Sequence, residues 1–181
     1  ATSSFPTWSK VFSGVGGTDP EFRGIEFHPT NSNIVYASGT DIYRSTDGGN
    51  TWSVYTGGMT GLNMGSLPNG STAQRINIAV TPAAADDLYA YMVAEDPGGA
   101  RRMLVYRRTG TTWTELYNYT STSAFNSISK GWTAIAVSPV DAGKIYVGHT
   151  KVRGTEDGGN NWGEKSPYNS TTYHADVHSL V

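Results

Sequence analysis

Three carboxylates stand in short segments that are predicted to join neighbouring strands, where a catalytic acid or base would be accessible. Asp41 lies in the segment ASGTDIYRS, and Glu95 and Asp96 lie in AEDPGGARR. Two carboxyl groups can cleave a glycosidic bond when they are about 5–5.5 Å apart, with retention of configuration, or about 6.5–9.5 Å apart, with inversion. Asp41, Glu95 and Asp96 are therefore candidate catalytic residues. The residues alone leave open whether a partner carboxylate comes from outside the chain.

A second group has the composition of a metal site. His174, Asp176 and His178 alternate along a predicted strand, so their side chains would share one face. Imidazole and carboxylate groups are ligands for Zn²⁺ and similar divalent ions. However, same-face neighbours on a strand are about 6.6 Å apart along the chain, which is wide for three ligands of one ion. The alternative is hydrogen-bonded packing, and no other cofactor is expected.

Aromatic residues in the long connections suggest a sugar-binding surface. Connections at 57–74, 119–131 and 168–173 are rich in Ser, Thr and Asn. The aromatic candidates for ligand binding are Tyr119, Phe125, Tyr168 and Tyr173. Aromatic faces and hydroxyl groups suit carbohydrate, and long loops on a rigid scaffold commonly carry binding. The alternative is that these segments are solvated connectors.

The elements that would position these residues are revealed by internal repetition. Four similar segments contain a tryptophan at equivalent positions, namely Trp8, Trp52, Trp113 and Trp162. Apolar strands that end in a proline turn precede the last three, at Pro29, Pro82 and Pro139. The apolar residues alternate with period two, which predicts short antiparallel strands. The repeat of about 50–60 residues is typical of four-stranded propeller blades.

The predicted fold is all-β, a β-propeller of four-stranded antiparallel blades with three complete blades and flanking strands. Residues 1–14 would be the outer strand of a preceding blade, and 174–181 the first strand of the next. The complete blades are expected at 22–58, 75–119 and 132–168. Propellers close with about 4–8 blades, so we expect part of a ring of about six to eight. The expected partners are the remaining blades or a second copy of the chain.

A recurring turn carries a family resemblance. The segment STDGGNTW at 45–52 fits the pattern Ser/Thr-x-Asp-x-Gly-x-x-Trp, called the Asp-box, and TEDGGNNW at 155–162 fits it again. The matching residues are Ser45, Asp47, Gly49 and Trp52 in the first copy and Thr155, Asp157, Gly159 and Trp162 in the second. The segment RRTGTTW at 107–113 keeps the tryptophan and lacks the aspartate. The requirements of the motif are structural: the aspartate accepts N–H bonds across the turn, the glycines permit positive φ, and the tryptophan fills the space between sheets.

Over nearly its whole length the sequence resembles the Asp-box (BNR) propellers, which include sialidases, sortilin-type receptors and xyloglucanase-type glycoside hydrolases. Asp41 stands at a position similar to a catalytic aspartate of the xyloglucanase-type family, whose pattern runs Arg-Thr-Asp-x-Gly-Gly-x-Tyr-Arg. Here Gly39 replaces the arginine, and the Gly-Gly pair before Tyr43 and Arg44 is absent. The Arg-Ile-Pro element of sialidases is also absent from the sequence.

The resemblance implies two functions. In the first, the chain is a non-catalytic propeller scaffold or interaction module of a secreted or cell-surface protein, with carbohydrate as a possible ligand. In the alternative, it is part of a xyloglucanase-type hydrolase that acts on polysaccharide. A formal net charge of -2 without a basic stripe argues against nucleic acid as a partner. The sequence contains no apolar run of about 18 residues, and so it predicts no membrane-spanning helix.

Overall fold

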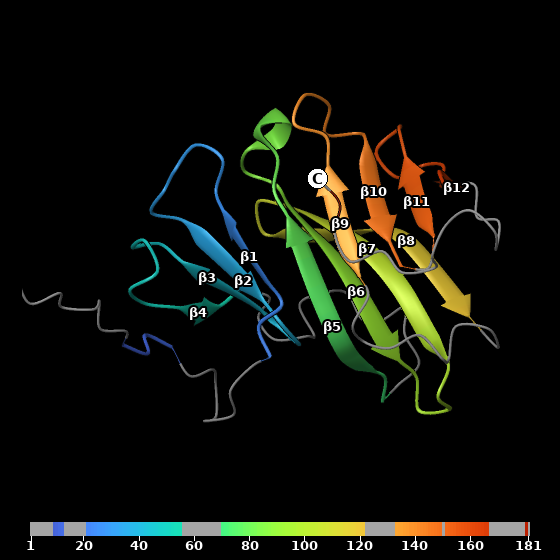
Figure 1. The fold of residues 1–181 in the computed structure, drawn as a ribbon, viewed down its shortest axis with the longest axis horizontal. Helices are drawn as coiled ribbons and strands as arrows, with labels where there is room; N and C mark the ends of the chain where they lie inside the picture. Colours follow the sequence, from blue (N-terminus) through green and yellow to red (C-terminus); the bar gives the residue numbers. More distant parts are fainter. Residues whose placement is uncertain are drawn as a thin grey trace, which may run out of the picture.

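The computed structural model describes residues 9–12, 21–55, 70–121, 133–149, 151–166 and 180. In these residues the backbone forms three antiparallel sheets of four strands each, with strand orders β1-β2-β3-β4, β5-β6-β7-β8 and β9-β10-β11-β12. Each strand pairs with its neighbour in sequence, so every sheet is a simple meander (Figure 1). The described residues contain no α-helix, and their one helical turn is the 3-10 turn η4.

The strand bounds follow the order of the chain. The first sheet contains β1 (Gly24–Phe27), β2 (Val35–Ser38), β3 (Ile42–Ser45) and β4 (Ser53–Val54). The second contains β5 (Thr72–Ala79), β6 (Leu88–Glu95), β7 (Arg101–Thr109) and β8 (Thr112–Ser121), with η4 (Pro82–Ala84) between β5 and β6. The third contains β9 (Ala134–Val137), β10 (Ile145–Gly148), β11 (Val152–Thr155) and β12 (Gly163–Glu164).

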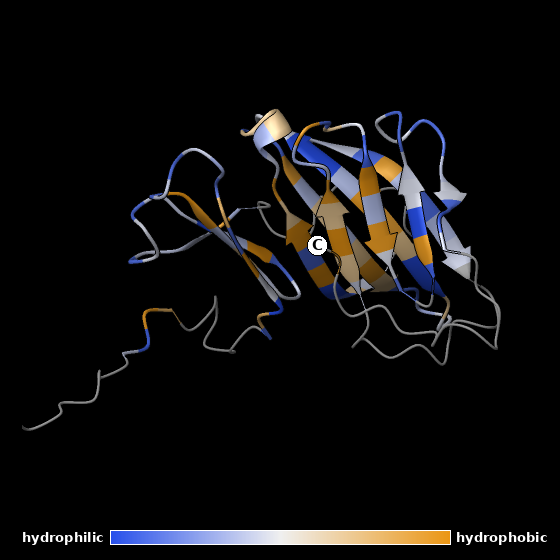
Figure 2. Ribbon diagram, turned by 45° about the horizontal axis from the view of Figure 1, so that its top comes forward, coloured by the Kyte–Doolittle hydropathy of each residue, from blue (hydrophilic) through white to orange (hydrophobic). Residues whose placement is uncertain are grey.

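The middle sheet is buried on both faces, and β6 shows why. Its sequence LYAYMVAE is apolar almost throughout, and every residue except the last is buried. Because successive side chains of a strand point to opposite faces, Leu88 and Met92 pack toward the first sheet and Tyr89 and Tyr91 toward the third. Figure 2 shows that hydrophobic residues are concentrated in the strands, whereas the connecting turns are mostly hydrophilic.

Sheets that are stacked face to face, each a four-stranded antiparallel meander, are propeller blades. The prediction of an all-β, partial propeller with four-stranded blades is therefore confirmed by the structure. The apolar core lies in the two seams between the blades and not within any single sheet. The blades position the hairpin turns along their edges, and Asp41 and Asp96 lie on those turns.

The turn between β3 and β4 is held by the side chain of Asp47. Its Oδ1 accepts a hydrogen bond from the backbone N–H of Thr51 at 2.8 Å and another from the hydroxyl of Ser45 at 2.7 Å. Gly49 has a φ of 95°, a left-handed conformation that a residue with a Cβ rarely adopts. The turn carries Trp52 to the outer face of the first sheet, where its ring lies 6.3 Å from that of Phe12.

The turn between β11 and β12 repeats this arrangement and shows how it joins two blades. Asp157 Oδ1 accepts the backbone N–H of Asn161 at 2.9 Å. The Nε1 of Trp162 donates to the carbonyl of Leu116 on β8 at 2.9 Å, and its ring lies 4.7 Å from that of Tyr117. A Cβ on Gly159 would come within 2.9 Å of the Leu116 side chain, so the close approach of the blades requires glycine there.

Candidate functional site

The candidate carboxylates lie at equivalent hairpins of neighbouring blades, Asp41 and Asp96 on the turns and Glu95 at the end of β6. We call this side of the blades the hairpin edge; it contains residues 39–41 between β2 and β3, 96–100 between β6 and β7, and the connection between β10 and β11. The first of these turns touches the second blade directly, because the carbonyl of Gly39 accepts the backbone N–H of Ile76 at 2.7 Å. The hairpin edge is thus where residues of different blades can approach one another.

Asp41 is half-buried at the start of β3. One carboxylate oxygen, Oδ1, accepts a hydrogen bond from the backbone N–H of Ile42 at 2.8 Å. Burial and, to a smaller degree, the negative charge of Asp41 raise the pKa of the Tyr43 phenol. The local role of Asp41 is therefore to hold the first residue of the strand.

Glu95 and Asp96 are each held by an arginine across the β6–β7 hairpin. Glu95 pairs with Arg101 at 3.1 Å. Arg102 Nε donates to both oxygens of Asp96, at 2.9 and 3.1 Å, and the Ser71 hydroxyl donates to Oδ1 at 2.8 Å. The Asp96 side chain is only 9% exposed. Carboxylates that are neutralised and hydrogen-bonded in this way are suited to fixing a hairpin.

The structure places the three candidate carboxylates on two neighbouring blades, each with partners from its own blade. Asp41 accepts the backbone N–H of Ile42, and Glu95 and Asp96 pair with arginines across the β6–β7 hairpin. The residues missed by sequence reasoning are the arginines Arg101 and Arg102. The β6–β7 register, with Glu95 opposite Arg101, explains why they meet. A tight turn at residues 96–100 flanked by opposite charges is the signal that could have revealed them.

The predicted aromatic surface is described only at Tyr119. This residue, on β8, stacks parallel to Tyr117 with ring centroids 6.4 Å apart, and the Arg153 guanidinium lies 5.1 Å from its ring centre. Phe125, Tyr168 and Tyr173 lie outside the described residues. The candidate metal ligands His174, Asp176 and His178 lie outside them as well. In the part of the chain that the structure describes, no cluster of three or more His, Cys, Asp or Glu side chains has the arrangement of a metal site.

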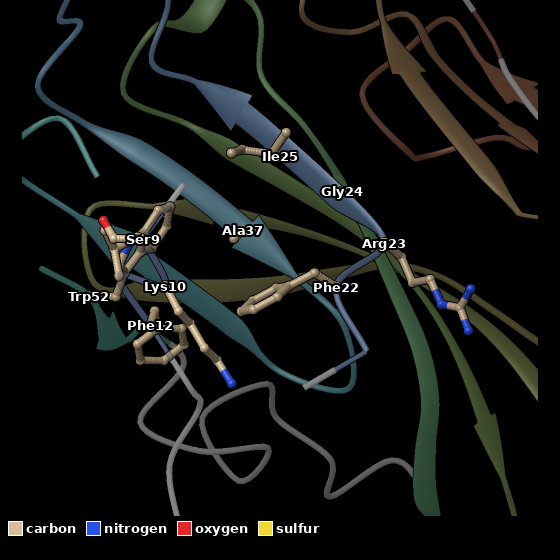
Figure 3. A pocket seen from close by; sticks show the side chains of 10 residues that line it. Ser9, Lys10, Phe12, Phe22, Arg23, Gly24, Ile25, Ala37 and Trp52 are labelled. Carbon is tan, nitrogen blue, oxygen red and sulfur yellow. The ribbon is translucent and has the colours of Figure 1, made fainter. Parts of the chain in front are cut away.

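A groove of about 510 Å³ lies on the outer face of the first sheet (Figure 3). Its walls are mainly apolar and aromatic, from Val11, Phe12, Phe22, Ile25, Ala37 and Trp52, with the polar residues Ser9, Lys10 and Arg23 at its margins. Ile25 is 62% exposed, whereas Ile78 and Ile135, at the same distance before the proline turns of the next blades, are 4% and 9% exposed.

The composition of the groove is that of a seam between blades. Phe12 and Trp52 face each other here as Tyr117 and Trp162 do between the second and third blades. Large apolar residues contiguous on a surface indicate an interaction site. The groove therefore differs from the hairpin edge, where polar groups gather.

Comparison with known proteins places these blades in a class. No family model matches the chain. A xyloglucanase of Hypocrea jecorina (strain QM6a) is 32% identical over 148 residues, which are 81% of this chain and 15% of that protein. An ancestral GH74 enzyme of solved structure covers 82% of this chain with a TM-score of 0.54 and 19% identity, and the match is 19% of that enzyme.

A more distant match is YCF48 from Cyanidioschyzon merolae, which covers 80% of this chain and 39% of that one with a TM-score of 0.43 and 15% identity. The comparisons thus identify a propeller that is related to glycoside hydrolases. The chain spans less than a fifth of the xyloglucanase and of the ancestral enzyme. None of the helical segments described in the structure has the length and hydropathy to cross a membrane.

Proposed function

We propose that these blades are a non-catalytic scaffold and carbohydrate-binding portion of a secreted protein that acts on xyloglucan or a similar polysaccharide. The polysaccharide is suggested by the relative that is 32% identical, a xyloglucanase. The non-catalytic part of the proposal is supported by the arginine pairing of Glu95 and Asp96. Secretion and an Asp-box propeller ancestry are part of the same proposal.

The observation that carries the proposal is the pairing of Glu95 and Asp96 with Arg101 and Arg102. A general base or nucleophile must have a free lone pair aimed at substrate. Asp96 already accepts three hydrogen bonds, from Arg102 twice and from Ser71. Both carboxylates therefore serve the hairpin.

The binding surface we propose is the aromatic pair on β8. Tyr117 and Tyr119 are parallel to within 1°, and Tyr119 is partly exposed. Arg153, beside Tyr119, adds hydrogen-bond donors to an aromatic face. Sugar rings pack on aromatic faces while their hydroxyls bind polar neighbours. Phe125, Tyr168 and Tyr173 stay predicted ligand-binding residues, and His174, Asp176 and His178 stay predicted metal ligands; all six lie outside the described residues.

A second function, catalysis by Asp41 in a hydrolase of the xyloglucanase type, is favoured by its position on the hairpin edge and by the xyloglucanase relative. In that case the partner carboxylate comes from another blade. Asp141, an exposed aspartate in the turn that precedes β10, provides a matched control because it lies away from the hairpin edge.

The test compares binding and turnover in the same chain. We expect xyloglucan to retard the protein in native gels and to release no reducing ends when incubated with it. The substitution Tyr119→Ala should weaken the retardation. Release of reducing ends that is lost in Asp41→Asn and retained in Asp141→Asn would overturn the non-catalytic proposal. Unretarded migration in xyloglucan gels, equal to that in gels without polysaccharide, would overturn the binding role.

A further inference from the structure

A small cavity lies between the second and third blades, where β8 faces β11. It is lined by Tyr91, Met103 and Tyr117 from the second blade and by Val147, His149, Lys151 and Arg153 from the third. Its volume is about 20 Å³. A cavity of this size has room for one occupant as large as a water molecule or slightly larger.

Two tyrosines in the wall of this cavity have buried hydroxyls. That of Tyr91 has no hydrogen-bond partner among the described residues, and that of Tyr117 has only the neighbouring Arg153 guanidinium beside it. Tyr91 is 1% exposed and packs in the apolar seam between the blades. The hydroxyl of Tyr117 is also shielded from solvent. Burying a hydroxyl without a partner is unfavourable. An occupant that accepts hydrogen bonds from both tyrosines would remove this penalty.

The charge around the cavity is positive. Within the described part of the chain, no carboxylate pairs with Arg153. Arg153 lines the cavity together with Tyr91 and Tyr117. Its positive charge opposes the effect of burial, which raises the pKa of both phenols. Lys151, by contrast, has its ammonium group on both oxygens of Glu164, at 2.8 and 2.9 Å. None of the lining residues carries a carboxylate.

We infer that the cavity binds one small anion such as chloride, held by the hydroxyls of Tyr91 and Tyr117 and by the guanidinium of Arg153. Both phenols stay protonated at neutral pH because burial raises their pKa values, and so both act as donors. A water molecule could accept from the tyrosines, but it would leave the half-buried guanidinium without a counter-charge. Because the donors come from two blades, the anion would fasten the second blade to the third.

Thermal unfolding in matched salts tests this site. The chain is unfolded in sodium chloride and in sodium gluconate at equal ionic strength, since gluconate is far too large for the cavity. We expect a saturable rise of the midpoint in chloride, by about 2–4 °C when chloride exceeds its Kd several-fold. Tyr91→Phe should abolish the chloride-specific rise and, by removing an unpaired hydroxyl, should raise the midpoint in gluconate.

Tyr89→Phe is the matched control. Tyr89 lies on the same strand and faces the same seam, but its hydroxyl donates to the carbonyl of Ala142 at 3.3 Å and does not line the cavity. This variant should keep the chloride response. If Tyr91→Phe does not fold, Tyr117→Phe takes its place, with the same expected loss.

Crystals soaked in sodium bromide give a direct measurement, because bromide replaces chloride and scatters anomalously. An anomalous peak within hydrogen-bond distance of the two hydroxyls is the expected result. Equal midpoints in chloride and gluconate, a chloride response that persists in Tyr91→Phe, or a water molecule in the cavity without anomalous signal would each overturn the proposal. These readouts do not involve polysaccharide, so they are independent of the proposed function.

Discussion

Removing the same side chain from two neighbouring blades tests whether the blade seams carry the stability of this protein. Ile25 and Ile78 both precede a proline turn by four residues. Ile78 is 4% exposed in the seam between the first and second blades, and Ile25 is 62% exposed on the open outer face. Truncating a buried isoleucine to alanine costs about 2–5 kcal/mol, and a surface substitution about 0.5 kcal/mol.

We therefore expect Ile78→Ala to lower the free energy of unfolding by about 2–5 kcal/mol and Ile25→Ala to change it by about 0.5 kcal/mol. Urea denaturation followed by tryptophan fluorescence measures both, provided that the dependence on denaturant is the same for the two variants. Ile135→Ala, in the third blade, should behave like Ile78→Ala because Ile135 is 9% exposed. Equal losses for Ile25 and Ile78 would refute the reasoning, since they would mean that the outer face of the first blade is covered.

Three further changes probe the turns and the hairpin edge. Hydrogen bonds within the turns lower the pKa of Asp47 and of Asp157 from 3.8 to about 2. The stability that these bonds provide is present above about pH 4 and is lost as the pH falls toward 2. The midpoint of thermal unfolding should therefore fall over that interval, and it should fall less in the double variant Asp47→Asn/Asp157→Asn. Arg102→Ala leaves the Asp96 carboxylate buried without its partner. It should lower the free energy of unfolding, measured by urea denaturation, by about 1.5–3 kcal/mol. A smaller loss for the double variant Arg102→Ala/Asp96→Asn would identify the unpaired charge as the cause. Trp162→Phe loses the Nε1 hydrogen bond across the seam. It should lower the free energy of unfolding by about 1–2 kcal/mol. An unchanged midpoint of urea denaturation would show that the bond is dispensable.

The fold could be predicted because its determinants are local and repeated. The strands β1, β5 and β9 end two or three residues before Pro29, Pro82 and Pro139, since proline has no N–H for a sheet and restricts the residue before it. Trp162 fills a blade seam, where a large ring buries the most apolar surface. The sequence did not predict that the strands of the middle blade would be up to ten residues long.

The candidate site was less predictable because residue type does not reveal pairing. Glu95 and Asp96 have the chemistry of catalytic acids, and only the register of the β6–β7 hairpin shows that each forms an ion pair with an arginine. The cavity between the second and third blades is a stronger case. Tyr91 and Arg153 are far apart in the sequence and belong to different sheets, and nothing in the local pattern of either strand indicates that they approach each other.

The middle blade shows which part of the repeat the packing requires. Its β7–β8 turn lacks the aspartate and uses Gly110, at a φ of 60°, yet Trp113 is still buried in the seam with the first blade. There Arg108 donates to the carbonyl of Tyr55 at 3.0 Å and covers the Tyr55 ring at 3.6 Å. At the next seam the indole of Trp162 donates to a carbonyl of β8 in the same way. In the second and third blades a donor thus satisfies a carbonyl of the blade before it, from Arg108 in one and from the Asp-box Trp162 in the other, whereas the Trp52 indole of the first blade donates to Gly49 within its own turn. The repeat is therefore defined by the contact between blades, and the turn that supplies it can vary.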